Sequence, residues 1–388
     1  MRGAILTGLM AAIVAVTAPV AAADVVSLPA SFPVTNTDGS GAPCASDGKP
    51  YVLRGEVTGP RAVLAGSGPA TATLYLHEYS FDDYWHFQTV PGVDYAAAMG
   101  AAGHVSVTID RLGYDDSPQP DGSAICIGAQ ADMAHQIVQQ LRAGTYQLDG
   151  AVARGYGHVV LAGHSVGAVI AELEAYSFAD IDALMLFGHS DGDYSTASLR
   201  TGVAQGVRCA AGGDTTDPAG YAFYGSAEES RALAYHDAEP AVMDAQLALR
   251  HPDPCGDVNS LVPAIAVNKQ RAGEIAVPVL LVYGRADATL ADGAPERQAQ
   301  AYTGSGDVSS AFFDKTGHAL VLERAGAAIE ATVAAFLAGH RFGPAPAARA
   351  QLIRVRGLPR RCARRAFRLR IAAPARPVRV ALDGHLLR

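Results

Sequence analysis

The pentapeptide at 163–167, G-H-S-V-G, constrains the fold of this chain more than any other stretch. An apolar run at 159–162 leads into it, and a segment with apolar residues at helical spacing leads out of it. Glycines on both sides of the serine let a strand and a helix approach closely around an abrupt turn. The sequence therefore predicts a strand, a tight turn and a helix that present the hydroxyl of Ser165 at the apex.

Strand-like and helix-like patterns alternate on both sides of this turn, which predicts an α/β fold with a mostly parallel sheet covered by helices on both faces. Two short strands at 51–57 and 61–65 precede the alternation, around Gly59 and Pro60. The predicted strands of the alternation are 71–76, 104–109, 159–162, 183–187, 277–283 and 308–313, and the predicted helices are 95–101, 129–142, 166–177, 295–302 and 322–338.

The segment from about 190 to 274 interrupts the alternation. It contains clusters of Gly, Asp and Pro, short helical pieces and two cysteines. Since it is far too long for a simple connection between a strand and a helix, we expect it to form a cap over the site.

The N-terminus has the pattern of a secretory signal peptide at 1–23. Arg2 precedes an uncharged apolar stretch at 4–18, and Ala21 and Ala23 form an A-x-A cleavage pattern. We predict a mature chain that begins at Asp24, has no integral membrane segment, and is secreted or held at the cell surface.

Export gives the cysteines a structural meaning, because disulfides persist in oxidising compartments. Four cysteines allow three pairings, and we favour Cys44–Cys126 and Cys209–Cys255, since the latter two share the inserted segment. Cys362 is then left over.

The C-terminal segment at 341–388 differs from the rest in charge. It holds 13 arginines and one acidic residue, whereas residues 1–340 hold 17 basic and 37 acidic residues and carry a net charge of −20. Alternating apolar and arginine residues at 367–371 predict β-strands rather than a basic helical arm. The segment resembles the opening strands of Arg-rich sandwich modules of exported actinobacterial proteins. We expect it to be weakly docked and to contact envelope polymers, and we expect no nucleic acid partner.

A serine hydroxyl needs a base to take its proton, and that base needs a third group to orient it. Asp287 lies four residues beyond the strand at 277–283, and His318 follows the strand at 308–313. The order Ser165, Asp287, His318, each after a strand, is that of a Ser-His-Asp hydrolase. Other carboxylates could also reach the histidine, and these alternatives are Asp191, Asp193 and Asp292.

Residues of roughly 50–340, within a domain that we expect to span 24–340, resemble the secreted, esterase- or lipase-like α/β-hydrolases. The resemblance rests on the pentapeptide, on the run D-R-L-G-Y-D-D-S-P at 110–118, and on the loops at 284–287 and 317–318. It implies that Ser165 is the nucleophile, His318 the general base and Asp287 its orienting acid. It also implies an oxyanion hole formed by the backbone amides of Val166 and Tyr79, with no cofactor and no metal.

Glu78 departs from the family pattern, which has glycine after the histidine at this position. A carboxylate beside an oxyanion hole would oppose the developing negative charge. We therefore expect the Glu78 side chain to face away from Ser165. We also expect His164 to pack into the fold, His77 to join neighbouring loops, and the run at 251–257 to be a rigid loop without a metal.

The predicted function is ester hydrolysis by acyl transfer. The inserted segment is aliphatic and contains Tyr and Phe residues, which favours an ester with an apolar or aromatic group; these residues are Tyr221, Phe223, Tyr224 and Tyr235. Two alternatives stay open: a C–C hydrolase or haloperoxidase-like enzyme with the same three residues, and a non-catalytic surface-binding protein on a hydrolase scaffold.

Overall fold

The computed structural model describes residues 24–42 and 44–343, together with short strands at 354–356, 370–372, 380–382 and 385–387. The predicted signal peptide and Cys362 lie outside the described residues. Within the described part of the chain, no helix combines the length and the apolar character needed to cross a membrane.

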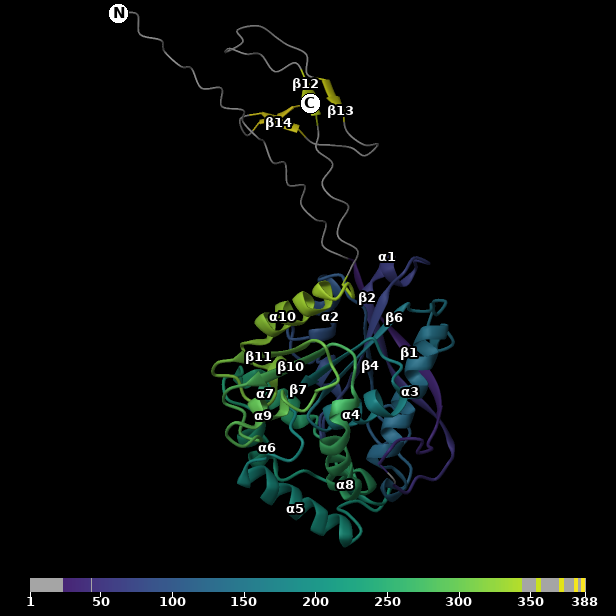
Figure 1. Ribbon diagram of the computed structural model, residues 1–388, viewed down its shortest axis with the longest axis vertical. Coiled ribbons are helices and arrows are strands. Elements are labelled where there is room, and N and C mark those ends of the chain that lie inside the picture. Colours follow the sequence, from purple (N-terminus) through teal and green to yellow (C-terminus); the bar gives the residue numbers. More distant parts are fainter. Residues whose placement is uncertain are drawn as a thin grey trace, which may run out of the picture.

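A nine-stranded sheet forms the centre of the molecule (Figure 1), with the strand order β11-β10-β7-β6-β3-β4-β2-β1-β5. The strands from β11 to β4 run parallel, and β2, β1 and β5 add an antiparallel edge. The predicted mostly parallel sheet is therefore confirmed. Its strands are β1 (Val25–Thr35), β2 (Pro50–Pro60), β3 (Thr71–Leu76), β4 (Ser106–Ile109), β5 (Gln147–Leu148), β6 (His158–His164), β7 (Ala183–Phe187), β10 (Val279–Gly284) and β11 (Val308–Phe313).

Helices cover both faces of the sheet, because its parallel strands are apolar on both sides. Along β6, Val159 and Leu161 belong to one buried cluster and Val160 and Ala162 to another. The first cluster includes the inner sides of α3 (Ile127–Ala143) and α4 (Val166–Phe178). The second includes α2 (Tyr95–Ala101) and α10 (Gly326–Gly339). The remaining helices on the sheet are α1 (Arg61–Leu64) and α9 (Ala294–Gln298).

The segment between β7 and β10 lies at the lower end of the molecule in Figure 1, beyond the carboxyl ends of the parallel strands. Its helices are α5 (Thr196–Ala210), α6 (Ala227–Ala234), α7 (Pro240–Ala248) and α8 (Cys255–Arg271). A two-stranded ladder of β8 (Tyr221–Ala222) and β9 (Asp253–Pro254) joins its two halves. The buried carboxylate of Asp253 fixes this segment to the loops after β3 and β4, since it accepts hydrogen bonds from the Ser80 amide at 2.7 Å and from the Tyr114 hydroxyl at 3.0 Å.

Two local predictions were wrong. Residues 61–64 form the short helix α1 rather than a strand; Pro60 is the N-cap of this helix, and the described ladder of β2 with β1 ends at the pair Val25–Pro60. The sequence analysis also missed β1, whose two prolines weaken the strand pattern.

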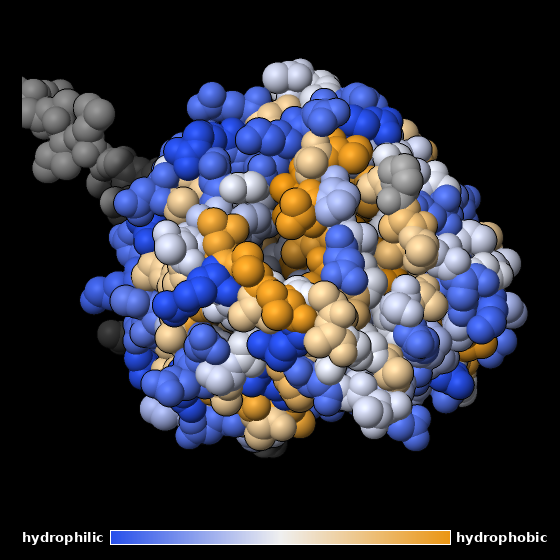
Figure 2. All heavy atoms as spheres, turned by 90° about the horizontal axis from the view of Figure 1, so that it is seen from below, coloured by the Kyte–Doolittle hydropathy of each residue, from blue (hydrophilic) through white to orange (hydrophobic). Residues whose placement is uncertain are grey.

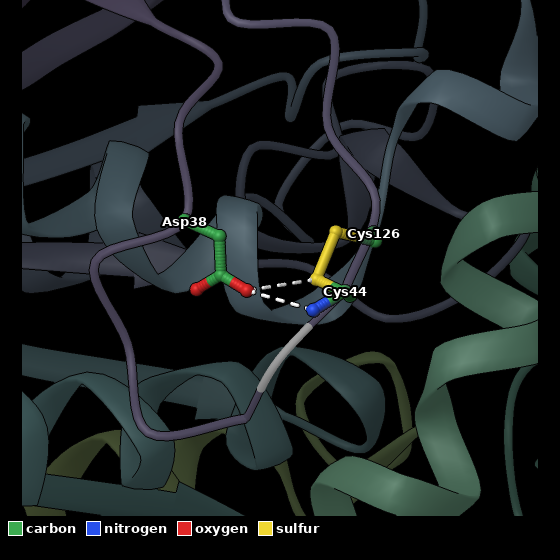
Figure 3. Close-up of side chains that lie close together, drawn as sticks. All are labelled: Asp38, Cys44 and Cys126. Atoms are coloured by element: carbon green, nitrogen blue, oxygen red, sulfur yellow. Dashed lines mark hydrogen bonds between the residues drawn. A yellow bond between two sulfur atoms is a disulfide. The ribbon is translucent and has the colours of Figure 1, made fainter.

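Both preferred disulfides are present. Cys44–Cys126 ties the entry loop to the start of α3, and the Cys44 amide donates a hydrogen bond to Asp38 Oδ2 at 2.9 Å (Figure 3). Cys209–Cys255 joins the end of α5 to the first residue of α8. The pairing prediction is confirmed.

The described strands of the C-terminal segment pair antiparallel, β12 (Arg354–Arg356) with β13 (Arg370–Ala372) and β14 (Val380–Leu382) with β15 (His385–Leu387). The expectation of β-structure holds for these residues. Most residues of the segment at 341–388 lie outside the described residues, so its expected weak docking stays a prediction.

Candidate active site

Ser165 occupies the turn between β6 and α4 in a strained conformation, with φ 53° and ψ −116°. Such positive φ values are rare for residues other than glycine and persist only where the surroundings enforce them. The Ser165 amide donates a hydrogen bond to the Phe187 carbonyl at the end of β7, at 2.9 Å. The predicted abrupt turn is therefore present.

The two flanking glycines are required by close backbone contacts. A Cβ atom on Gly163 would lie 2.1 Å from the Gly167 carbonyl oxygen, and one on Gly167 would lie 2.3 Å from the Leu76 carbonyl oxygen. Any larger residue would push α4 away from β3. The pentapeptide thus sets the position of the serine by allowing helix and sheet to touch.

His318 and Asp287 form a buried pair on the loops after β11 and β10. His318 Nδ1 donates to Asp287 Oδ2 at 2.7 Å. The other carboxylate oxygen of Asp287 accepts hydrogen bonds from the amide and the hydroxyl of Thr289, at 2.8 and 2.6 Å. Asp287 is therefore held as an acceptor toward the histidine, as the sequence predicts.

Opposing effects act on the pKa values of this pair. Burial would raise the pKa of Asp287, but the charge and hydrogen bond of His318, with the two bonds from Thr289, hold it below its ordinary value. Burial would lower the pKa of His318, but Asp287 and then Glu78 raise that pKa to about 9. In the absence of substrate the imidazole is thus favoured in its protonated form at neutral pH.

The alternative acids are directed elsewhere. Asp191 contacts Gln298 and His189, and Asp193 pairs with Arg297 at 2.7 Å. Asp292 is exposed. Of these candidates, Asp287 is the carboxylate that lies at His318.

Glu78 does not face away from the site, and this prediction was wrong. Its side chain is buried, with Oε2 at 3.6 Å from His318 Nε2 and Oε1 at 3.2 Å from His164 Nδ1. The carboxylate thus lies between the two histidines, although neither Glu78 Oε1 nor His164 Nδ1 has a hydrogen-bond partner among the described residues. In the described chain no hydrogen bond joins Ser165 Oγ to His318 Nε2, and Glu78 is the acidic neighbour of that nitrogen.

His164 and His77 have the structural roles predicted for them. His164 stacks on Tyr84 with ring centroids 4.1 Å apart, and its Nε2 donates to the His318 carbonyl at 2.9 Å. His77 Nε2 accepts from the Arg111 amide at 3.0 Å, which joins the loops after β3 and β4. His164 does more than pack, since it also contacts Glu78.

The run at 251–257 anchors the inserted segment. Asp257 is fully buried and forms an ion pair with the buried guanidinium of Arg111 at 2.9 Å. Arg111 also donates to the Glu78 carbonyl at 3.4 Å. The run therefore fixes the start of α8 to the loop that carries Glu78.

Glu172, His189 and Asp191 form a further buried group whose ligand atoms could surround a metal ion. However, His189 Nε2 already lies 2.5 Å from Glu172 Oε2 and 3.3 Å from Asp191 Oδ1. Burial would lower the pKa of His189, but the two carboxylates raise it to about 10. The two acids place opposite charges around the imidazolium, although Glu172 Oε1, His189 Nδ1 and Asp191 Oδ1 have no hydrogen-bond partner among the described residues. The sequence did not predict this group, because its members carry no recognisable spacing.

A pocket of about 400 Å³ opens beside Ser165 and His318. Tyr79, Val166 and Glu78 also line it, so every predicted site residue except Asp287, which lies behind His318, faces this space. Neither the Tyr79 amide nor the Val166 amide donates to a described protein group. The rest of the lining is mainly aliphatic and comes from α5, α6 and α8: Leu199, Val203, Leu233, Leu261, Val262 and Ile265.

The aromatic residues of the pocket differ from those predicted. Of the four expected, Tyr224 alone lines the pocket, and three other aromatic residues line it as well: Tyr79, Phe81 and Tyr194. The Tyr221 hydroxyl bonds to Pro120, and the Tyr235 hydroxyl to Gln246. The lining therefore combines aliphatic and aromatic side chains, and most of its aromatic residues are not the predicted ones.

No family model and no curated protein sequence matches this chain. Solved structures do resemble it. An esterase from Thermogutta terrifontis has a TM-score of 0.54 and 17% identity, over 79% of this chain and 98% of that one. The enol-lactonase from Burkholderia xenovorans LB400 has a TM-score of 0.55 and 19% identity, over 76% and 100%.

The monoacylglycerol lipase of Paleococcus ferrophilus also resembles it, with a TM-score of 0.51 and 15% identity over 70% and 97% of the two chains. At these identities the likeness concerns the fold. Together with the sheet order and the serine turn, it shows that this chain has the α/β-hydrolase fold.

Proposed function

We propose that this protein is a secreted serine hydrolase that cleaves carboxylic esters through an acyl-enzyme. The observation that carries the proposal is the shared pocket of Ser165 and His318, with Asp287 bonded to the far nitrogen of the imidazole. The predicted signal peptide and the two disulfides support export.

In the proposed mechanism Ser165 Oγ adds to the ester carbonyl carbon while its proton passes to His318 Nε2. The amides of Val166 and Tyr79 donate to the oxyanion, and Asp287 stabilises the imidazolium. His318 then gives the proton to the alcohol oxygen as the C–O bond breaks. Water adds to the acyl-enzyme in the same way, which releases the acid and restores the serine.

This mechanism requires His318 to turn from Glu78 toward Ser165 when substrate binds. Glu78 accepts from the protonated Nε2, whereas Ser165 must donate its hydroxyl proton to the neutral Nε2, and hydrogen bonds at catalytic sites are often long before substrate is present. We propose that the segment at 190–274 acts as the cap that supplies the acyl pocket, since α5, α6 and α8 provide most of its aliphatic lining.

Labelling with a fluorophosphonate probe tests the proposal directly. We expect covalent labelling of the wild type and none of Ser165→Ala, and hydrolysis of p-nitrophenyl esters by the wild type alone. A folded wild-type protein that is neither labelled nor active would favour the non-catalytic scaffold. Equal hydrolysis by both proteins would remove Ser165 from the mechanism.

A further inference from the structure

Helices α5 and α8 expose apolar side chains beside the mouth of the pocket. Leu199, Val203 and Val207 of α5 are 53%, 68% and 66% exposed, and Val262 of α8 is 73% exposed. These are four of the seven large apolar side chains that are exposed in the described part of the chain. We call these four residues the α5–α8 face.

The α5–α8 face is one continuous surface. Leu199, Val203 and Val207 are spaced four residues apart and lie along one side of α5. Disulfide Cys209–Cys255 fixes α5 to α8. Figure 2 looks at the end of the molecule that carries these two helices and shows apolar residues on both sides of a hollow.

The face is continuous with the pocket that holds Ser165. Leu199, Val203 and Val262 line this pocket as well as being exposed, whereas Val207 lies outside it. An apolar molecule on the face would therefore meet an apolar path to the nucleophile. The partner that fits such a surface is the apolar phase in which a water-insoluble ester is dissolved.

Charge also distinguishes the face from the rest of the protein. Residues 1–340 carry a net charge of −20, yet α5 has two arginines and no acidic residue. The only acidic residue of α8, Asp257, is buried against Arg111. Neither helix thus carries an exposed carboxylate of its own, and the neighbouring Asp214 pairs with Arg208 near the end of α5 at 3.2 Å. An apolar end of this kind on an acidic body is suited to approach a lipid surface.

We propose that the α5–α8 face docks on a lipid surface and delivers an ester dissolved there to Ser165, an inference that rests on the proposed esterase function. Docking places the pocket mouth against the lipid, so that the substrate enters without crossing water. Val207 contributes to docking alone, because it does not line the pocket.

The test measures sedimentation of the chain from Asp24 to Arg388, without the predicted signal peptide and as the Ser165→Ala variant, with phosphatidylcholine vesicles. About 0.5 M NaCl shortens the screening length to roughly 4 Å and weakens binding through the arginine-rich tail. We expect vesicle binding, and about tenfold weaker binding when Val207→Glu is added, because the exposed valine no longer transfers into lipid. Val152→Glu is the matched control, since Val152 is 89% exposed in the loop before β6, at the opposite end of that strand from Ser165.

Activity separates this inference from the proposed function. Val207→Glu in the active protein should hydrolyse a soluble short-chain ester at the wild-type rate and a vesicle-borne long-chain ester about tenfold more slowly at limiting vesicle concentration. Hydrolysis of the soluble ester without vesicle binding would overturn docking and leave the esterase proposal standing. Vesicle binding without hydrolysis of any ester would overturn substrate delivery.

Equal vesicle binding by Val207→Glu and Val152→Glu would show that the face does not dock. Light scattering measures the oligomeric state and so tests whether a second copy of this chain, rather than lipid, binds the α5–α8 face. A dimer that Val207→Glu separates, in a protein that does not bind vesicles, would assign the face to self-association and refute the proposal.

Discussion

Replacing Glu78 with glutamine should shift the pH dependence of hydrolysis to lower pH. The Glu78 carboxylate lies 3.6 Å from His318 Nε2 and helps raise the pKa of this histidine to about 9. The base must be neutral to accept the Ser165 proton, so activity rises as pH increases through the His318 pKa. Removing the negative charge favours the neutral imidazole and moves this rise to lower pH.

The size of the shift follows from the distance. Two unit charges at this separation interact by roughly 4–5 kcal/mol at an effective dielectric constant of about 20. Since one pKa unit corresponds to about 1.4 kcal/mol, this is an upper value of about three units, and water entering near the glutamine reduces it. We expect a downward shift of about one to three units, and at least tenfold higher kcat/KM at pH 7 than in the wild type.

The assay is kcat/KM for a soluble p-nitrophenyl ester between pH 5 and pH 10, for the wild type, Glu78→Gln and the control Glu228→Gln. Glu228 is exposed on α6, so its replacement removes the same charge without touching the site. A Glu78→Gln profile that coincides with both others would refute the reasoning. So would an upward shift.

The remaining predictions concern the orienting acid, the serine turn and the second disulfide. Asp287→Asn should lower kcat by roughly 10³- to 10⁴-fold in steady-state assays with little change in KM, because His318 loses the acceptor that orients it; a loss below tenfold would contradict this role. Gly167→Ala should lower the free energy of unfolding in urea by about 1–3 kcal/mol, since its Cβ would lie 2.3 Å from a backbone oxygen, and wild-type stability would show that no such contact exists. The double variant Cys209→Ala, Cys255→Ala should lose about 4 kcal/mol, the loop entropy of a 46-residue separation, in the same measurement, and no loss would mean that the bond does not constrain the unfolded chain.

The three proposed catalytic residues could be predicted because each follows a strand. The carboxyl ends of parallel strands meet at one edge of a sheet, so Ser165, Asp287 and His318 had to come together once the alternation was recognised. The direction of Glu78 could not be predicted in this way. Its conformation depends on His164 and His318, which are distant in sequence and face it only after β3, β6 and β11 have assembled.

The strands with two apolar faces could also be predicted from the sequence. Strand β1 could not, because Pro29 and Pro33 interrupt its pattern and its pairing with β2 over its full length forms only in the folded sheet. The lining of the pocket beside Ser165 could not be predicted from the sequence either. The Tyr and Phe residues of the inserted segment were expected to line it, but the Tyr221 and Tyr235 hydroxyls form hydrogen bonds elsewhere, and Tyr79, Phe81 and Tyr194 line the space beside Tyr224.

The buried group of Glu172, His189 and Asp191 gives a physical reason why the loops can hold catalytic geometry. Glu172 lies on α4, the helix that begins after Ser165, and accepts from the Tyr302 hydroxyl at 3.2 Å. The Tyr283 hydroxyl, at the end of β10, donates to the His189 carbonyl at 2.9 Å. These bonds connect the helix of the nucleophile to the strand that leads to Asp287, and breaking a buried pair by removing one partner is strongly destabilising. The spacing of the three proposed catalytic residues therefore depends on polar contacts that lie behind the pocket and take no part in the chemistry.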